Sequence, residues 1–289
     1  SSDIDIFCVF AEDGETSGPR VRDHGDYFTR LTQQLAKSLD ALTVDGFVAR
    51  VDQRLRPWGS AGQLAIPVVA CEDYYEVHGR EWERFALLKA RPVAGDRDLG
   101  TNLLHSLKPF MYRKYLDFGV FESIRDLKSK IEREVRRNGR DQNVKVGRGG
   151  IREIEFIVQS MQLLRGGQIP TLQVTGFLEA LSALVDESIL TADDGRQLRE
   201  DYLWLRHVEH VIQAENDQQT QELPADCGPL AAVLGFESAD QFETVRRQVT
   251  DRVHEAFVSF MRVEQPVEPQ QTQVSEAVRE RLDALRENP

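Results

Sequence analysis

Two stretches decide the fold of the first part of the chain: Ser1-Ser2-Asp3-Ile4-Asp5-Ile6-Phe7 and Val48-Ala49-Arg50-Val51-Asp52-Gln53-Arg54-Leu55-Arg56-Pro57. Successive side chains of an extended strand point to opposite faces, so Asp3 and Asp5 share one face. The second stretch alternates in the same way and has Asp52 on its polar face. If the two strands are neighbours, the three carboxylates lie together.

Such a group of carboxylates predicts a metal site. Three clustered carboxylates repel one another unless a hard cation lies among them, and their oxygens suit Mg²⁺ or Mn²⁺. Arg54 and Arg56 follow Asp52 directly, and aspartates for a metal beside arginines for phosphate are typical of nucleotidyl transfer. An Asp-x-Asp pair alone is more often a strand end with solvated acids. The third aspartate and the two arginines therefore carry the interpretation.

The composition predicts a globular protein with a sizeable core. The chain has 289 residues, of which 40% are hydrophobic, and this length is sufficient for two domains. Its formal net charge of −12 opposes nonspecific binding to nucleic acid or to an anionic membrane. We therefore expect neither of them as a partner, and any phosphate site must be a local basic cluster.

Cysteine usage predicts a reducing, cytoplasmic location. Cys8, Cys71 and Cys227 are far apart and odd in number, which argues against a disulfide framework or a zinc site. The sequence has no apolar run of transmembrane length and no visible signal peptide. It begins without Met, directly in an expected strand, so we expect the N-terminus to be truncated.

The spacing of apolar residues predicts a helix between the two aspartate strands. Five residues recur at helical spacing and are expected to face the core: Phe28, Leu31, Leu35, Leu39 and Leu42. Asp45-Gly46 is then a turn signal. Residues 64–69 are expected to form another short strand.

Residues 72–91 are dense in aromatic and charged side chains. A buried stripe is expected from Trp82, Phe85 and Leu88, with Arg84 on another face. One interpretation is an amphipathic helix with a salt-bridged outer face. The other places Lys89 and Arg91 beside phosphates, at the end of a helix and the start of a strand.

From residue 101 onward the pattern is almost entirely helical. Four apolar stripes mark the expected helices: Leu103, Leu107, Phe110 and Met111; Ile124, Leu127, Ile131 and Val135; Leu198, Tyr202, Leu205, Val208 and Ile212; and Phe242, Val245, Val249, Val253, Phe257 and Phe260. Thr191 or Asp193 is expected to open the third helix, and Ser238 to cap the fourth. Residues 265–272 are rich in Pro and Gln, which predicts a linker before a short charged helix.

A glycine-rich basic loop, Lys145-Val146-Gly147-Arg148-Gly149-Gly150, precedes an expected helix. Free backbone N–H groups, the positive end of the helix dipole and Arg148 are expected to face an anion there, which predicts a phosphate or nucleotide contact. A polar stripe on the helix consists of Arg152, Glu155 and Gln159. We expect this stripe to face the three aspartates; the alternative is an ordinary solvated helix face.

Four ordered motifs resemble those of the bifunctional glutamine synthetase adenylyltransferase/adenylyl-removing enzymes. They are Ser-Ser-Asp-Ile-Asp-Ile at 1–6, Arg-Val-Asp-Gln-Arg-Leu-Arg-Pro at 50–57, Glu-Asp-Tyr-Tyr with Gly-Arg-Glu-Trp-Glu-Arg and Lys-Ala-Arg within 72–91, and Gly-Gly-Ile-Arg-Glu-Ile-Glu-Phe at 149–156. The resemblance extends from residue 1 to about 262. The Gly-Arg-Glu-Trp-Glu-Arg and Gly-Gly-Ile-Arg-Glu motifs are similar to those of the N-terminal, adenylyl-removing half of the family.

The resemblance implies an α+β fold that is predominantly helical overall. A nucleotidyltransferase domain of the DNA polymerase β type is expected at residues 1–97, a helical bundle at 98–264, and a linker with a terminal helix at 265–289. The glycine-rich turn that precedes the first aspartate motif in the family is absent, because this sequence starts after it.

Residue by residue, the resemblance implies that Asp3, Asp5 and Asp52 are catalytic and hold the divalent metal, Mg²⁺ or Mn²⁺. Nucleotide and phosphate binding is implied for Arg54, Arg56, Lys89, Arg91, Arg148, Gly149, Gly150, Arg152 and Glu155. The glycines and the last two of these residues belong to the motif that faces the active site in the family.

The implied reaction is phosphorolysis. Inorganic phosphate attacks the phosphorus of AMP on a glutamine synthetase tyrosine and yields ADP, in the control of nitrogen assimilation. The implied partners are adenylylated glutamine synthetase, the PII signal protein, ADP, ATP and phosphate. Two alternatives stay open: adenylyl transfer from ATP to glutamine synthetase, and a regulatory module that binds the PII protein.

Overall fold

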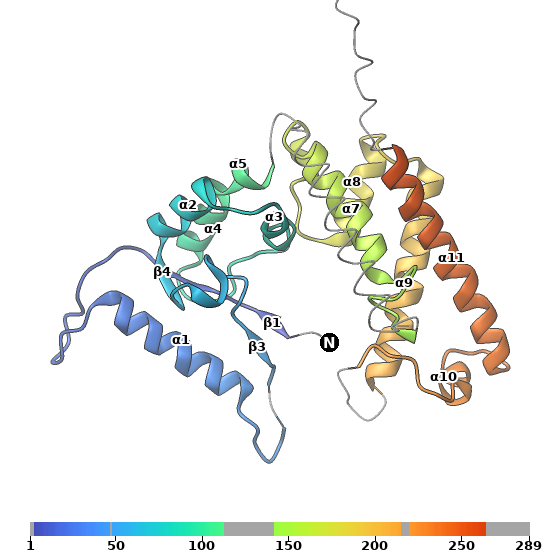
Figure 1. Cartoon of the computed structure of the whole chain (residues 1–289), viewed down its shortest axis with the longest axis horizontal. Helices are drawn as coiled ribbons and strands as arrows, with labels where there is room; N and C mark the ends of the chain where they lie inside the picture. The colour runs from blue at the N-terminus through green and yellow to red at the C-terminus, as the bar shows by residue number, and fades with distance from the viewer. Residues whose placement is uncertain (1–2, 47, 113–141, 215–219, 264–289) are drawn as a thin grey trace, which may run out of the picture.

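A computed structural model describes residues 3–46, 48–112, 142–214 and 220–263 (Figure 1). Its described part is mostly helical with small sheets, which confirms the α+β class. The expected helix at 124–135 and the linker and terminal helix at 265–289 lie outside the described residues. Of the helices inside the described ranges, none is long and apolar enough to cross a membrane.

The first part of the chain alternates short strands with helices. In chain order it contains β1 (Ile4–Asp5), β2 (Cys8–Phe10), α1 (His24–Asp40), β3 (Val51–Asp52), the 3-10 helix η1 (Gly59–Ala61), β4 (Ala65–Pro67), α2 (Val68–Val77), α3 (Glu81–Leu87), α4 (Arg97–Ser106) and α5 (Lys108–Met111). The expected strand at 64–69 is confirmed in part as β4, because residues 68 and 69 already belong to α2. No strand follows α3 within residues 88–96, contrary to the expectation at Arg91.

The two aspartate strands are neighbours, as predicted. β1 pairs with β3 in parallel, with Ile4 opposite Val51 and Asp5 opposite Asp52. The N–H of Ile4 donates to the carbonyl of Arg50 at 2.8 Å. A second parallel pair joins β2 to β4. In each pair one strand precedes α1 and the other follows it, so α1 is part of both crossover connections. These contacts bring carboxylates that are 47 positions apart in sequence into direct register.

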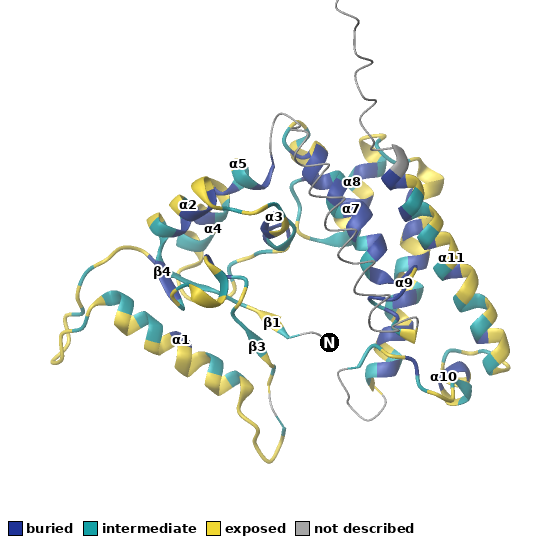
Figure 2. Ribbon diagram, in the orientation of Figure 1, coloured by how far each residue is buried: buried dark blue, intermediate teal, exposed yellow. Residues whose placement is uncertain are grey.

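Helix α1 forms as predicted, but its apolar face is not all core. Asp23 caps the helix by accepting a hydrogen bond from the N–H of Asp26 at 3.2 Å. Phe28 stacks on Phe10 with ring centroids 5.0 Å apart, whereas Leu31 and Leu35 are 48% and 42% exposed. The short strands offer a surface too narrow to cover the whole stripe, and Figure 2 shows α1 as largely exposed.

The segment 72–91 forms two helices instead of one. They are separated at Gly79, where an added Cβ would lie 2.5 Å from a ring carbon of Phe110. Trp82 is 39% exposed and not part of a buried stripe. Arg84, expected to face outward, is only 2% exposed, because its guanidinium lies 5.0 Å from the centroid of the Phe110 ring and 3.2 Å from Glu81.

The second part of the chain consists of packed helices. They are α7 (Ile151–Arg165), the 3-10 helix η3 (Pro170–Leu172), α8 (Phe177–Asp186), α9 (Ala192–Ala214), α10 (Gly228–Val233) and α11 (Ala239–Val263). The expected N-caps are confirmed: the hydroxyl of Thr191 accepts from the N–H of Asp194 at 3.1 Å, and that of Ser238 from the N–H of Gln241 at 3.2 Å.

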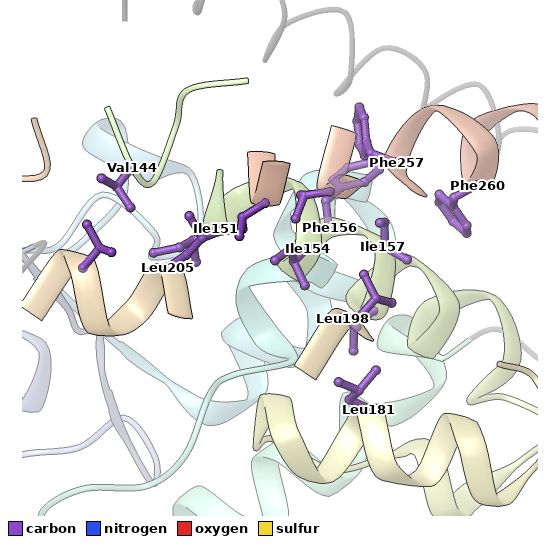
Figure 3. Packing of buried hydrophobic residues seen from close by; sticks show 14 of the residues in the cluster. Val144, Ile151, Ile154, Phe156, Ile157, Leu181, Leu198, Leu205, Phe257 and Phe260 are labelled. Atoms are coloured by element: carbon purple, nitrogen blue, oxygen red, sulfur yellow. The ribbon is translucent and has the colours of Figure 1, made fainter. Parts of the chain in front are cut away.

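Helix α7 is the centre of the larger core. It contacts α8, α9 and α11, and Figure 3 shows Ile151, Ile154, Phe156 and Ile157 of α7 among the buried side chains of those helices. Arg152, Glu155 and Gln159 are partly exposed, as the predicted polar stripe requires, and so is the apolar Met161.

One helix joins the two hydrophobic cores. Leu163 of α7 belongs to the smaller core, which otherwise consists of residues from β4 to Tyr112. Phe85 of α3 packs against both cores, and its ring stacks on that of Phe156 with centroids 5.5 Å apart. The position of α7 relative to the strands is therefore set by aromatic packing.

Candidate functional site

The three predicted aspartates lie together at the β1–β3 pair. Asp5 and Asp52 are opposite each other on adjacent strands, and Asp3 lies two residues before Asp5 on the same strand face. The pKa of Asp5 is raised above its ordinary value, first by partial desolvation and then by the negative charges of Asp52 and Asp3. This mutual repulsion is the electrostatic signature of a carboxylate cluster.

Two arginines already neutralise the outer members of this cluster. The side-chain Nε of Arg54 donates to Asp52 Oδ2 at 2.8 Å, and its backbone N–H donates to Asp52 Oδ1 at 2.8 Å. These contacts hold the pKa of Asp52 below its ordinary value. Arg50 Nε lies 3.0 Å from Asp3 Oδ1. Sequence analysis did not assign Arg50 a role, although its position on the polar face of the second strand was a usable signal.

The three carboxylates are suitable ligands for a divalent metal, but their side chains are not arranged around one common point. Carboxylate oxygens are the ligands that Mg²⁺ and Mn²⁺ prefer. Within the part of the chain that the structure describes, however, no three His, Cys, Asp or Glu side chains are placed to hold one ion. Asp52 is turned to Arg54 and Asp3 to Arg50. A metal would have to compete with these guanidinium groups for its ligands.

Arg56 is used inside its own loop, and its expected role in phosphate binding stays a prediction. It is buried, and its guanidinium donates to the backbone carbonyls of Gln53 at 2.6 Å, Gly62 at 3.0 Å and Ser60 at 3.2 Å. All three nitrogens are therefore used inside residues 53–62. Arg56 organises the loop that follows Asp52.

Lys89 contacts helix α7 in the second part of the chain. Its Nζ lies 3.1 Å from Glu155 Oε1 of α7, so two residues expected at the phosphates pair with each other across the junction. Arg91 is exposed two residues further along. Arg152 is half-buried on α7, three residues before Glu155.

The start of α7 does not have the free N–H groups that an anion site requires. Its first N–H groups donate to the carbonyls of its own loop: Gly150 to Gly147, Ile151 to Val144, Arg152 to Lys145 and Glu153 to Gly150, at 3.0 to 3.1 Å. The N–H of Gly149 donates to the Glu153 carboxylate. The N–H groups of Gly149 and Gly150 are thus already used inside the loop, and their expected phosphate contact stays a prediction.

Arg148 and Gly149 serve the packing of the loop against α11. Arg148 Nη1 lies 2.5 Å from Asp251 Oδ1, and its expected contact with phosphate stays a prediction. Gly149 has φ +67°, and an added Cβ would lie 1.9 Å from the carbonyl oxygen of Thr250. Only glycine tolerates both conditions. This close approach explains Gly149, whereas an added Cβ at Gly150 would lie 2.7 Å from the Val144 carbonyl oxygen of its own loop.

Two further residues of this region were missed by sequence analysis. Glu153 is buried and accepts from His254 Nδ1 of α11 at 3.1 Å; burial raises the pKa of this carboxyl, while His254 opposes the rise. Lys145, at the start of the loop, lowers the pKa of Asp5 through its positive charge. Lys145 thus contributes a positive charge from the second part of the chain to the carboxylate cluster.

Comparison with family models divides the chain in the same place as its two cores. A model described as glutamate-ammonia ligase adenylyltransferase matches residues 1–106. A model described as GlnD PII-uridylyltransferase matches residues 125–261. The first match contains the three aspartates, and the second contains the glycine-rich loop and α7.

Curated relatives match most of the chain under one name, bifunctional glutamine synthetase adenylyltransferase/adenylyl-removing enzyme. The protein of Hahella chejuensis is 50% identical over 274 residues, which is 93% of this chain and 28% of the relative. The proteins of Pseudomonas putida and Pseudomonas aeruginosa are 50% and 49% identical over 84% and 82% of this chain, and each match covers 25% of the relative. The chain therefore spans about a quarter of the length of these relatives.

Proposed function

The chain belongs to the family of bifunctional glutamine synthetase adenylyltransferase/adenylyl-removing enzymes, and from this membership we propose that it removes AMP from adenylylated glutamine synthetase. The proposed reaction is phosphorolysis, in which inorganic phosphate takes the adenylyl group and ADP is released. Residues 1–97 are proposed as a nucleotidyltransferase domain of the DNA polymerase β type, and 98–264 as its helical partner domain.

The observation that carries this proposal is the register of the aspartate strands. Asp5 and Asp52 are paired across β1 and β3, and the pKa of Asp5 is raised first by partial burial and then by the carboxylates beside it. Such a cluster is costly without a cation. Phosphoryl-group chemistry commonly places carboxylates in this way to hold divalent metal ions.

We propose that Asp3, Asp5 and Asp52 hold Mg²⁺ or Mn²⁺. When bound, the metal would neutralise charge on the reacting phosphoryl group. The chain's own residues have separate tasks. Arg54, exposed apart from its contacts with Asp52, is placed to exchange that carboxylate for a substrate phosphate. Lys145 compensates Asp5, and Arg56 keeps the loop behind Asp52 in one conformation.

Replacing the paired aspartates tests the proposal. We expect Asp5→Asn and Asp52→Asn each to lower ADP formation from adenylylated glutamine synthetase, phosphate and Mg²⁺ by at least about 100-fold, the scale of losing one electrostatic contributor to a transition state. The melting temperature of Asp5→Asn should be unchanged or raised, because the substitution relieves repulsion. Asp40→Asn, at the exposed end of α1, is the matched control. Near-normal ADP formation by Asp5→Asn would contradict the proposal.

The opposite direction of the reaction is the main alternative. Supplying ATP and unmodified glutamine synthetase, and measuring AMP attachment, separates transfer from removal. A second alternative is supported by the name of the model that matches residues 125–261, GlnD PII-uridylyltransferase. A module that only bound the PII protein would show no activity in either assay, and Asp5→Asn would leave its binding unchanged.

A further inference from the structure

Trp58 adopts an unusual backbone conformation beside the proposed site. Its φ is +59° and its ψ is 9°, in the left-handed region that a bulky residue seldom adopts. Its side chain is nevertheless 49% exposed. Strain of this kind persists only where the surroundings over-determine the backbone, and such positions cluster at ligand sites.

Contacts within residues 53–62 hold this turn. Arg56 binds the carbonyls of Gln53, Ser60 and Gly62, on both sides of Trp58. Gly62 permits the closure, since an added Cβ would lie 2.0 Å from the carbonyl oxygen of Pro57. The loop therefore has one conformation, imposed by a buried guanidinium.

A buried polar chain fixes Trp58 from the other side. The N–H of Trp58 donates to the phenol oxygen of Tyr74, and the Tyr74 hydroxyl donates to Glu83 Oε1 at 2.9 Å. Glu83 Oε2 accepts from the N–H of Arg80 at 2.7 Å and so caps α3. Tyr74 and Glu83 are both buried. Residues from two motifs that are separate in the sequence, Tyr74 and Glu83, thus hold the backbone of Trp58 in place.

The indole lies against two other rings and keeps much of its surface in solvent. Its centroid is 4.6 Å from that of Tyr74, at an interplanar angle of 59°, and 6.3 Å from that of His78. These contacts prevent the ring from rotating freely. An aromatic surface that is already ordered loses little entropy when it binds another flat ring.

The turn is also close to the carboxylate cluster. Gln53 directly follows Asp52, and a single guanidinium contacts both the Gln53 carbonyl and the Ser60 carbonyl, at 2.6 Å and 3.2 Å. Ser60 is two residues from Trp58. Arg56 therefore joins the residue that follows Asp52 to the residue two positions after Trp58, which places the turn beside the strand end that carries Asp52.

We propose that Trp58 is a stacking platform for the adenine ring of the nucleotide that the aspartate site acts on. The inference rests on the proposed function and adds a binding site for the uncharged adenine ring. Base–aromatic stacking is typically worth enough to change binding by roughly fivefold or more. Trp58→Ala should therefore weaken ADP binding by at least that factor, while Trp58→Phe should retain most of it.

Fluorescence and calorimetry together test this. In a chain carrying Trp82→Phe and Trp204→Phe, Trp58 is the remaining tryptophan. ADP with Mg²⁺ should change its fluorescence saturably, whereas pyrophosphate with Mg²⁺, which has no base, should bind without that change. Calorimetry of the unaltered chain, Trp58→Ala and the exposed-surface control Trp82→Ala then gives ADP affinity without relying on any indole.

The outcomes separate the two proposals. Equal ADP affinity in Trp58→Ala and the unaltered chain would overturn the stacking role and leave the proposed function standing. If the unaltered chain bound neither ADP nor pyrophosphate, the proposed function would fail first and the stacking role with it. A fall in melting temperature of Trp58→Ala with unchanged ADP affinity would assign the indole to packing against Tyr74 alone.

Discussion

At the scale of single residues, the surroundings of a carboxylate decide the direction in which its pKa shifts. Asp52 receives hydrogen bonds from Arg54 and has a lowered pKa, whereas the pKa of Asp5 is raised by partial burial and by the carboxylates beside it. The pKa of Glu243 on α11 is lowered in the same way as that of Asp52. Hydrogen bonds from Arg246 and Arg247 lower it to about 2. Equivalent carboxyl groups thus differ because of the cations within reach.

The Glu243 pKa predicts a pH dependence of stability. A carboxyl group whose pKa is lower in the folded state stabilises the fold above its unfolded pKa and loses that contribution as the pH falls towards the folded pKa. Glu243→Gln should therefore lower the melting temperature at pH 6, and the difference should shrink between the ordinary pKa of 4.5 and about 2. Thermal unfolding followed by circular dichroism at several pH values measures it. Glu255→Gln, an exposed position of the same helix, is the control; a difference independent of pH would refute the assignment.

At the scale of elements, the loop before α7 is an internal helix cap. Its carbonyls accept the first N–H groups of the helix, and Asn143 Oδ1 accepts from the N–H groups of Lys145 and Val146 at 3.0 and 2.9 Å. Val144 and Val146 are buried. This loop brings the charge of Lys145 towards Asp5, and Gly149 packs against α11.

Two glycines with positive φ distinguish packing from backbone strain. Gly235→Ala, at φ +83° with nothing near its Cβ position, should cost about 1 to 2 kcal/mol, the cost of the left-handed conformation alone. Gly149→Ala adds a collision with the backbone of Thr250, which cannot move as a side-chain end does. We expect it to lower the free energy of unfolding in urea clearly more than Gly235→Ala. Equal losses would show that α11 does not constrain the loop.

At the scale of the whole molecule, α7 belongs to both cores. Phe85 contacts each core, Phe156 stacks on it, and Lys89 pairs with Glu155 beside this stack. The ion pair is largely solvent-exposed on the lysine side, so it contributes little energy. The aromatic contact supplies most of the coupling between the carboxylate strands and the helices.

Removing that contact should separate the unfolding of the two cores. Phe85→Ala is expected to split a single thermal transition into two in calorimetry. Because Phe85 is only partly buried, its total cost should lie below the roughly 3 to 5 kcal/mol typical of deleting a fully buried phenylalanine. Phe28→Ala, which removes a stack with Phe10 inside the first part alone, should lower stability without splitting the transition. A single transition in Phe85→Ala would place the coupling elsewhere along α7.

The sequence by itself determined the local structure and the membership of the chain. Alternation predicted the aspartate strands and their shared polar face, and helical spacing with Thr191 and Ser238 predicted α9 and α11 and their starts. Both patterns depend on neighbours within a few residues, so they survive without knowledge of the fold. The ordered motifs, confirmed by the curated relatives, identified the family.

Only the tertiary structure decided which partner each charged group has. Arg56, Arg148 and the N–H groups of the glycine loop were all expected to be available for phosphate, yet they contact the loop carbonyls, Asp251 and the chain's own backbone. Leu31 was expected in the core and is exposed. Long flexible side chains reach several partners, and burial depends on what another element covers. The outcome is therefore set by packing between segments distant in sequence, which no local pattern encodes.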